Sequence, residues 1–241
     1  MAKQDGSQRI KQLQRISKME IKKLFFPSRC GGCGKLIKVN ETVCRECGES
    51  LMRIAQPACR HCGMSLDDCT CDTQAFYFEN YAAAFIYQGA TVEMLHGMKF
   101  HRKKEIAVYF ARSLAQTAAR AFPDAEFDLV IGIPMTKRDI KQRGYNQSDI
   151  MSKHTARFLH TAYSSSALIK TRETEKQHTL NSQQRKINLA GAFSADKNAV
   201  DSKTVLLCDD IRTTGSTLYY ATDALLSAGA KAVYCVTVAL V

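Results

Sequence analysis

Two adjacent carboxylates, Asp209 and Asp210, and the hydroxyl-rich turn behind them are the residues of this chain best suited to chemistry. A short apolar run, residues 205–208, precedes them, and five small residues follow: Thr213, Thr214, Gly215, Ser216 and Thr217. Such a run predicts a strand buried on both faces of a parallel sheet. Residues 218–229 have the apolar spacing of a helix that ends at a glycine. The order is therefore strand, loop and helix N-terminus.

This order predicts a site for a phosphorylated sugar. Backbone N–H groups at the start of a helix, together with the positive end of its dipole, bind phosphate. The hydroxyls add donors, and Gly215 lets the backbone approach the ligand closely. The carboxylates would face the ribose, accept hydrogen bonds from its hydroxyls and help to hold a magnesium ion. Paired acids before threonine and serine also occur as an ordinary helix N-cap, but the complete order favours the ligand site.

The segment from residue 205 to residue 218 resembles the loop that binds 5-phosphoribosyl-1-pyrophosphate (PRPP) in type I phosphoribosyltransferases. The resemblance implies that Asp209 and Asp210 are the catalytic pair, holding ribose and magnesium, and that residues 213–217 bind the 5′-phosphate. Further cations follow a predicted strand, residues 127–134: Lys137, Arg138 and Arg143. Cations at the end of a strand suit a pyrophosphate group, so we expect them to complete the PRPP site. A solvated basic loop is the alternative.

Eight of the ten cysteines lie before residue 72, paired at the spacing of metal ligands. The pairs are Cys30 with Cys33, Cys44 with Cys47, Cys59 with Cys62, and Cys69 with Cys71. Two such pairs close a tetrahedral zinc site, so we expect two structural zinc ions, with one ion as the alternative. Because the last pair has a shorter spacing, the sequence does not decide the ligand set of the second site, and His61 is an alternative ligand there. Disulfides would suit an exported chain, and redox chemistry would suit a single reactive pair.

Composition and charge indicate a globular protein with an anionic partner. The chain has 241 residues, a hydrophobic content of 45% and a net charge of +11. Residues 1–60 contain thirteen lysines and arginines against five acids. This excess suits nucleic acid or an anionic membrane surface, although a solvated face without a partner has the same composition. A secretory signal and a membrane-spanning segment are both missing from the pattern, so we expect a cytoplasmic protein, either free or peripheral at the inner face of the membrane.

Predicted strands alternate with predicted helices over most of the chain. Strands at 82–87, 127–134 and 232–240 and a helix at 106–121 favour an α/β fold, with a parallel sheet flanked by helices. We therefore divide the chain into a basic amphipathic helix (1–26), a double zinc-ribbon module (27–74) and a phosphoribosyltransferase-like domain (75–241). The helix either packs on the body of the protein or binds a membrane surface or a partner. The long polar stretch that begins at Lys170 is typical of a mobile lid.

Taken together, these motifs resemble the ComF family of competence proteins. The resemblance is carried by the cysteine module, residues 94–100 with Lys99 and Phe100, Pro134 with Arg138, residues 143–147, and residues 172–193. It implies a factor that handles incoming single-stranded DNA during natural transformation, near DNA-uptake proteins at the cytoplasmic membrane.

Two functions therefore remain open. One is an active PRPP-dependent transferase of unknown acceptor, which the site residues alone favour. The other is a competence factor that binds single-stranded DNA and uses PRPP as a ligand, which the family resemblance favours. In the second, aromatic side chains would stack on bases, although aromatic residues in such positions more often pack in a core. The candidates are Phe25, Phe26, Phe76, Tyr77 and Phe78.

Overall fold

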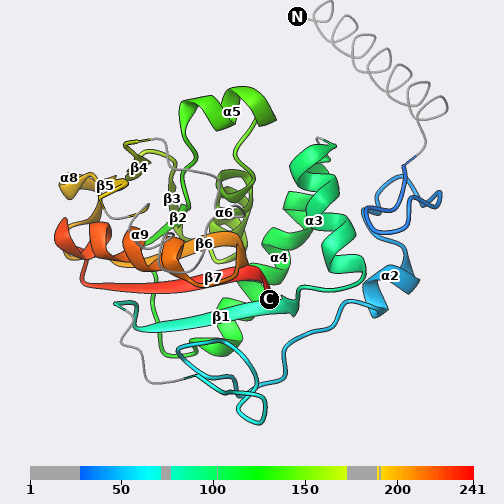
Figure 1. Ribbon diagram of the computed structural model, residues 1–241, viewed down its shortest axis with the longest axis horizontal. Coiled ribbons are helices and arrows are strands. Elements are labelled where there is room, and N and C mark those ends of the chain that lie inside the picture. Colours follow the sequence, from blue (N-terminus) through cyan, green and yellow to red (C-terminus); the bar gives the residue numbers. More distant parts are fainter. Residues whose placement is uncertain (1–27, 72–76, 102, 173–188, 190) are drawn as a thin grey trace, which may run out of the picture.

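A five-stranded parallel sheet forms the centre of the computed structural model, which describes residues 28–71, 77–101, 103–172, 189 and 191–241 (Figure 1). The strand order is β1-β7-β6-β2-β3, and all neighbouring strands are parallel. The strands are β1 (Asn80–Ile86), β2 (Leu129–Gly132), β3 (Ala162–Ser164), β6 (Thr204–Arg212) and β7 (Ala232–Leu240). The predicted α/β fold with a parallel sheet is confirmed.

Helices cover both faces of this sheet. The longer ones are α3 (Ala90–Phe100), α4 (Lys104–Ala121), α6 (Gln147–Phe158) and α9 (Ser216–Ser227). On β6, Leu206 and Cys208 belong to the apolar core shared with α3, α4 and α6, whereas Val205 and Leu207 belong to the core shared with α9. The apolar run before the carboxylates is therefore buried on both faces, as its sequence predicts.

Short elements complete the described part of the chain. They are α2 (Arg45–Glu49), α5 (Lys137–Arg143), α8 (Lys197–Val200), and the antiparallel pair β4 (Leu168–Lys170) and β5 (Phe193–Ala195). None of the helices in the described ranges is long and apolar enough to cross a membrane. The predicted helix at 1–26 and most of the predicted lid lie outside the described residues.

Two elements are longer than the sequence predicts. β6 does not stop at Cys208 but continues to Arg212, because β7 runs alongside it as far as the pairing of Arg212 with Leu240. The two carboxylates therefore lie within the last part of the strand rather than beyond it. Likewise, the pattern of residues 91–96 predicts a helix, and α3 extends beyond it to Phe100, so Lys99 lies in its last turn.

The cysteine-rich segment, residues 28–71, reaches the sheet at the outer strand β1, along which its residues 52–60 pack. The N–H of Ile86 donates to the carbonyl of Met52 at 2.9 Å, and the N–H of Tyr81 donates to the carbonyl of Arg60 at 3.0 Å. In Figure 1 the cyan part of this segment lies beside β1, whereas its blue part lies on the side of α3. Because an exposed strand edge is a template for aggregation, the segment protects the sheet at this edge.

Candidate functional site

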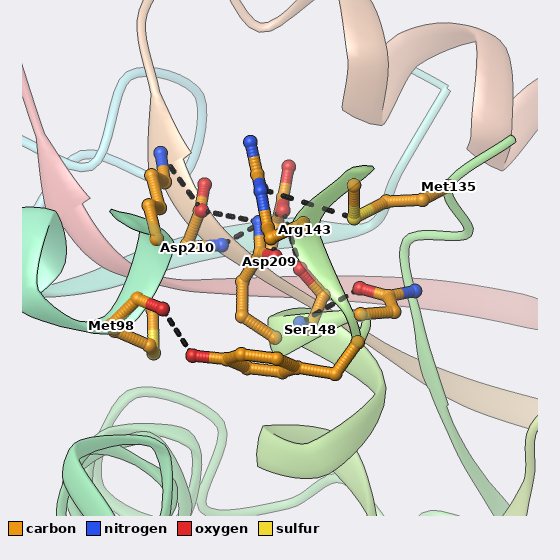
Figure 2. Close-up of polar contacts among 10 residues, drawn as sticks. Met98, Met135, Arg143, Ser148, Asp209 and Asp210 are labelled. Atoms are coloured by element: carbon orange, nitrogen blue, oxygen red, sulfur yellow. Dashed lines mark hydrogen bonds and ion pairs between the residues drawn. The ribbon is translucent and has the colours of Figure 1, made fainter. Parts of the chain in front are cut away.

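Asp209 and Asp210 are nearly buried, with 9% and 6% of their surface exposed, and both accept hydrogen bonds from α6. The Ser148 hydroxyl donates to Oδ1 of Asp209 at 2.9 Å, and the Gln147 amide donates to Oδ2 of Asp210 at 2.8 Å. Figure 2 shows Ser148, Asp209, Asp210 and Arg143 gathered at one place. The start of a helix thus faces two carboxylates, which its positive dipole end stabilises.

A glycine on β2 lets α6 come this close. A Cβ atom at Gly132 would lie 2.5 Å from the carbonyl oxygen of Ser148, a separation at which the backbone of α6 would have to move. The Asn146 side chain caps the helix by accepting from the N–H of Ser148, and it donates to the carbonyl of Ile133 at 2.9 Å. The position of the first turn of α6 is therefore fixed by β2 and by its own cap.

Lys99 is a site residue that the analysis of the sequence did not identify as one. Its ammonium lies 2.9 Å from Oδ2 of Asp210, and its side chain is 18% exposed. The Tyr145 hydroxyl donates to the carbonyl of Met98, which ties the end of α3 to the segment before α6. Lys99 lies in a segment that resembles the ComF family, and this resemblance was the one signal that could have identified it.

The two carboxylates have opposite shifts in pKa. Burial alone would raise the pKa of Asp210, but the ammonium of Lys99, the Gln147 amide and the Arg143 charge outweigh it and hold that pKa below its usual value. For Asp209, burial and then the charge of Asp210 raise the pKa, and the hydrogen bonds from the Asp210 N–H and Ser148 only partly oppose this. Asp210 is therefore the ionised member of the pair, and Asp209 is the member that takes up a proton.

The hydroxyl-rich turn lies between β6 and α9. We call residues 213–217 the phosphate loop. Thr213 is exposed, Thr214 and Thr217 are half-buried, and Ser216 is buried. Gly215 has φ +78°, a conformation that favours glycine, and it precedes α9 as an N-cap that makes no side-chain cap hydrogen bond. Thr214 and Ser216 share a hydrogen bond of 2.9 Å between their hydroxyls. The predicted order of strand, loop and helix start is confirmed.

The three predicted pyrophosphate-binding cations all lie on α5, which is a helix rather than a loop. Arg143, in its last turn, donates to the side-chain oxygen of Gln147 at 2.8 Å and lowers the pKa of Asp210. Lys137 and Arg138 lie exposed in the first turn, at the other end of the helix. Lys170, at the end of β4, also lies within electrostatic range of Asp209, and burial lowers the pKa of this lysine.

The eight amino-terminal cysteines form two separate groups of four. We call Cys30, Cys33, Cys44 and Cys47 the first cluster, and Cys59, Cys62, Cys69 and Cys71 the second cluster. In each, the four sulfur atoms lie within 4.8 Å of one another. Although one residue rather than two separates Cys69 from Cys71, both sulfur atoms join the second cluster. The four cysteines therefore supply a complete ligand set without His61.

The geometry of both clusters fits zinc. Four sulfurs about 2.3 Å from one ion stand ~3.8 Å apart at the corners of a tetrahedron. The Sγ atoms of Cys33 and Cys44 are 3.8 Å apart, and those of Cys59 and Cys71 are 3.5 Å apart. Partial burial would raise the pKa of the Cys30 and Cys59 thiols, but backbone N–H groups outweigh it and lower each pKa to about 6. One thiol of each cluster is thus favoured as a thiolate, whereas burial and neighbouring thiols raise the pKa of others, such as Cys47 and Cys62. Binding of a cation would release the protons of these thiols.

Of the aromatic residues considered for base stacking, two lie in the described part of the chain. Phe78 is 4% exposed and packs against Tyr81, so it is a core residue. Tyr77 is 48% exposed and stacks on Tyr219 of α9 at a centroid distance of 4.6 Å. Phe25, Phe26 and Phe76 lie outside the described residues.

Two family models match the chain. The double zinc ribbon domain matches residues 21–75, and the phosphoribosyl transferase domain matches residues 140–241. The DNA utilization protein YhgH of Escherichia coli K12 is 29% identical over 211 residues, covering 85% of this chain and 86% of that protein. The competence protein ComFC of Bacillus subtilis 168 is 28% identical over 207 residues, covering 82% and 83%.

These matches confirm the resemblance to the ComF family. The chain joins a double zinc ribbon to a phosphoribosyltransferase fold. A solved structure, the glutamine PRPP amidotransferase of B. subtilis complexed with ADP and GMP, is 23% identical, with a TM-score of 0.39. It covers 54% of this chain and 25% of that protein. The match to the double zinc ribbon domain spans both clusters, which have the composition of structural zinc sites.

We expect the purified protein to contain two zinc ions. Cys44→Ala should remove the ion of the first cluster and Cys62→Ala that of the second, each leaving one, because three thiolates hold zinc more weakly than four. Elemental analysis of the full chain measures this. Cys235→Ala, which changes a cysteine of the sheet core, should retain both ions. A wild-type protein with a single ion would contradict the prediction.

Lys99→Met should lower the free energy of unfolding at pH 7.5 by roughly 2 kcal/mol, because it leaves the Asp210 charge buried without its ammonium partner. Removing that ammonium raises the pKa of Asp210 in the folded variant. The deficit should therefore shrink as the pH falls and the variant's carboxyl takes up a proton.

Chemical denaturation at pH 7.5 and at pH 5 measures both effects. Lys153→Met, an exposed change on α6, is the control and should unfold like the wild type. A deficit that is equal at the two pH values would show that the ion pair is not its cause.

Proposed function

We propose that this chain is a cytoplasmic competence factor that binds PRPP with magnesium and handles single-stranded DNA. One observation supports the ligand above all: Asp209 and Asp210 are gathered with Lys99 and the start of α6, and only two residues separate the pair from the phosphate loop. In this proposal the carboxylates hold the ribose hydroxyls, and the loop hydroxyls and N–H groups hold the 5′-phosphate. Magnesium, when bound, would neutralise charge on the pyrophosphate.

The proposal for DNA rests on other observations. Relatives are named a competence protein and a DNA utilization protein, and the first quarter of the sequence is strongly basic. Basic residues along a zinc-ribbon module would track phosphates, and exposed Tyr77 offers a base a ring to stack on. We keep the division into residues 1–26, 27–74 and 75–241. We place the protein near uptake proteins at the inner face of the membrane.

A second candidate, an active PRPP-dependent transferase of unknown acceptor, is favoured by Arg143. Its guanidinium lies near the carboxylate of Asp210 and, with Lys137 and Arg138, would stabilise a departing pyrophosphate. Catalysis would then consist of positioning and leaving-group stabilisation. Release of pyrophosphate from PRPP in the presence of nucleobases or DNA separates this candidate from a protein that only binds.

Calorimetry with PRPP and magnesium tests the ligand. The wild type should bind, and the double variant Asp209→Asn with Asp210→Asn should bind at least tenfold more weakly, because it lacks both ribose-facing charges. Asp223→Asn, an exposed change on α9, is the matched control and should bind normally. Absence of binding by the wild type would exclude the PRPP site.

Fluorescence anisotropy with a labelled oligonucleotide tests DNA handling. Affinity should fall steeply as salt rises, because bound phosphates release counterions, and it should survive the double Asp→Asn change. Affinity without salt dependence would rule out phosphate tracking.

The protonation of Asp209 gives the PRPP site a pH dependence. Because its raised pKa favours the neutral form, binding of PRPP with magnesium should tighten as the pH rises and this carboxyl ionises. Ser148→Ala removes a donor to the charged form and should move the binding profile about one pH unit upward. Calorimetric titrations between pH 5.5 and 8.5 measure this shift.

Because the wild type and Ser148→Ala bind the same ligand, protonation of PRPP affects both binding profiles equally. It therefore does not contribute to the difference between them. Ser152→Ala, one turn further along α6, is the control, since that hydroxyl donates to the backbone carbonyl of Asp149. Equal profiles for the wild type and Ser148→Ala would mean that Asp209 does not govern binding.

A further inference from the structure

Arg212, the last residue of β6, is a buried cation directly before the phosphate loop. It is 6% exposed, although arginine side chains usually extend into solvent. Its main chain is part of the sheet, since the N–H of Val241 donates to its carbonyl at 3.1 Å. The side chain is therefore held inside the protein at the point where strand and loop meet.

The guanidinium of Arg212 reaches the second cluster. Its Nη1 donates to the carbonyl of His61 at 2.5 Å, and His61 lies between two of the cluster's cysteines, Cys59 and Cys62. The guanidinium carbon also lies 4.3 Å from the ring centroid of Tyr81 on β1, as in a cation–π contact. Arg212 thus joins the sheet to the turn that carries two thiols of the second cluster.

The phosphate loop packs against the same guanidinium. A Cβ atom at Gly215 would lie 2.9 Å from Nε of Arg212, so the loop backbone packs directly against the guanidinium. At the opposite end, a Cβ atom at Gly63 would lie 2.3 Å from the Tyr81 ring. Gly63, Tyr81, Arg212 and Gly215 therefore form a continuous stack from the second cluster to the phosphate loop.

We propose that this stack couples the metal occupancy of the second cluster to the phosphate loop, so that loss of zinc there weakens binding of PRPP. The proposal rests on the PRPP site proposed above. A four-thiol cluster in a short segment depends on its metal for its fold. Without the metal the carbonyl of His61 is no longer held in place, and the buried guanidinium that supports Gly215 loses this hydrogen bond.

The first cluster provides an internal control because it packs elsewhere. A Cβ atom at Gly31 would meet Ile106 of α4 at 3.0 Å, and one at Gly32 would lie 3.6 Å from Ala90 of α3. Coupling through Arg212 is thus specific to the second cluster. Coupling free energies are also reciprocal, so PRPP should in turn retain zinc at the second cluster.

Calorimetry with PRPP and magnesium tests the coupling in the full chain. Cys71→Ser, at an exposed thiol of the second cluster, should raise the dissociation constant about tenfold, a typical size for allosteric coupling. Cys33→Ser, at an exposed thiol of the first cluster, should leave it unchanged. Arg212→Met should reproduce the loss while both zinc ions remain bound, as elemental analysis would show.

A second measurement is made first on the wild type, where the result does not depend on the folding of any variant, and then on Cys33→Ser. A zinc-selective chelator that leaves magnesium in solution removes the ions, and their release is followed with and without PRPP. PRPP should slow the release of one ion of the two, and in Cys33→Ser it should slow the release of the remaining ion.

The outcomes separate the two proposals. If the wild type does not bind PRPP, the proposed function fails and the coupling fails with it. If the wild type binds PRPP but Cys71→Ser and Cys33→Ser bind it equally well, or PRPP protects both ions or neither, the PRPP site stands and the coupling alone is overturned.

Discussion

The close pairing of Asp209 and Asp210 is the constraint on which the arrangement around the sheet depends. Two neighbouring carboxylates with little access to water repel each other and lose hydration, so the fold must supply donors and a cation. Lys99 from α3 and the first turn of α6 supply them, and Gly132 on β2 gives that turn room. Three elements thus converge on the end of β6 for one electrostatic reason.

The two carboxylates have different neighbours and opposite shifts in pKa, and this difference has a chemical consequence. Asp210 has the ammonium of Lys99 beside it and keeps its charge, whereas Asp209 has one hydroxyl and one backbone N–H, and its pKa is raised. A pair of this kind accepts a further cation or hydroxyl group readily, because such a ligand relieves the repulsion that remains. The proposed sugar and metal would use this property of the pair.

Local patterns predict much of the fold, and partners distant in sequence explain what they miss. The apolar runs of β6 and β7 and the amphipathic helix α4 are visible in the sequence because burial acts on neighbouring residues. The residue at which β6 ends is not visible in the sequence, since pairing with β7 determines it. Thiol spacing predicts both clusters in the same local way, although only the fold brings Cys69 and Cys71 to the second one.

Only the part of the candidate site that is continuous in sequence could be predicted, because local patterns do not show partners that are distant along the chain. The carboxylates and the phosphate loop form one continuous motif, whereas Gln147 lies 63 residues from the carboxylate that it contacts and Lys99 lies on a different helix. Arg212 has no pattern of its own in the sequence. Its role follows from burial and from the carbonyl of His61, 151 residues away.

The position of the cysteine-rich segment connects these observations. Its residues 52–60 lie along β1, the strand at one edge of the sheet, and their backbone contacts there place the turn around His61 next to Tyr81. The residues that protect this edge therefore also bring the second cluster into contact with Arg212. Since the metal-dependent turn and the phosphate loop share one buried guanidinium, a disturbance of either changes the surroundings of the other. Protection of the sheet edge and support of the candidate site are thus two effects of the same packing.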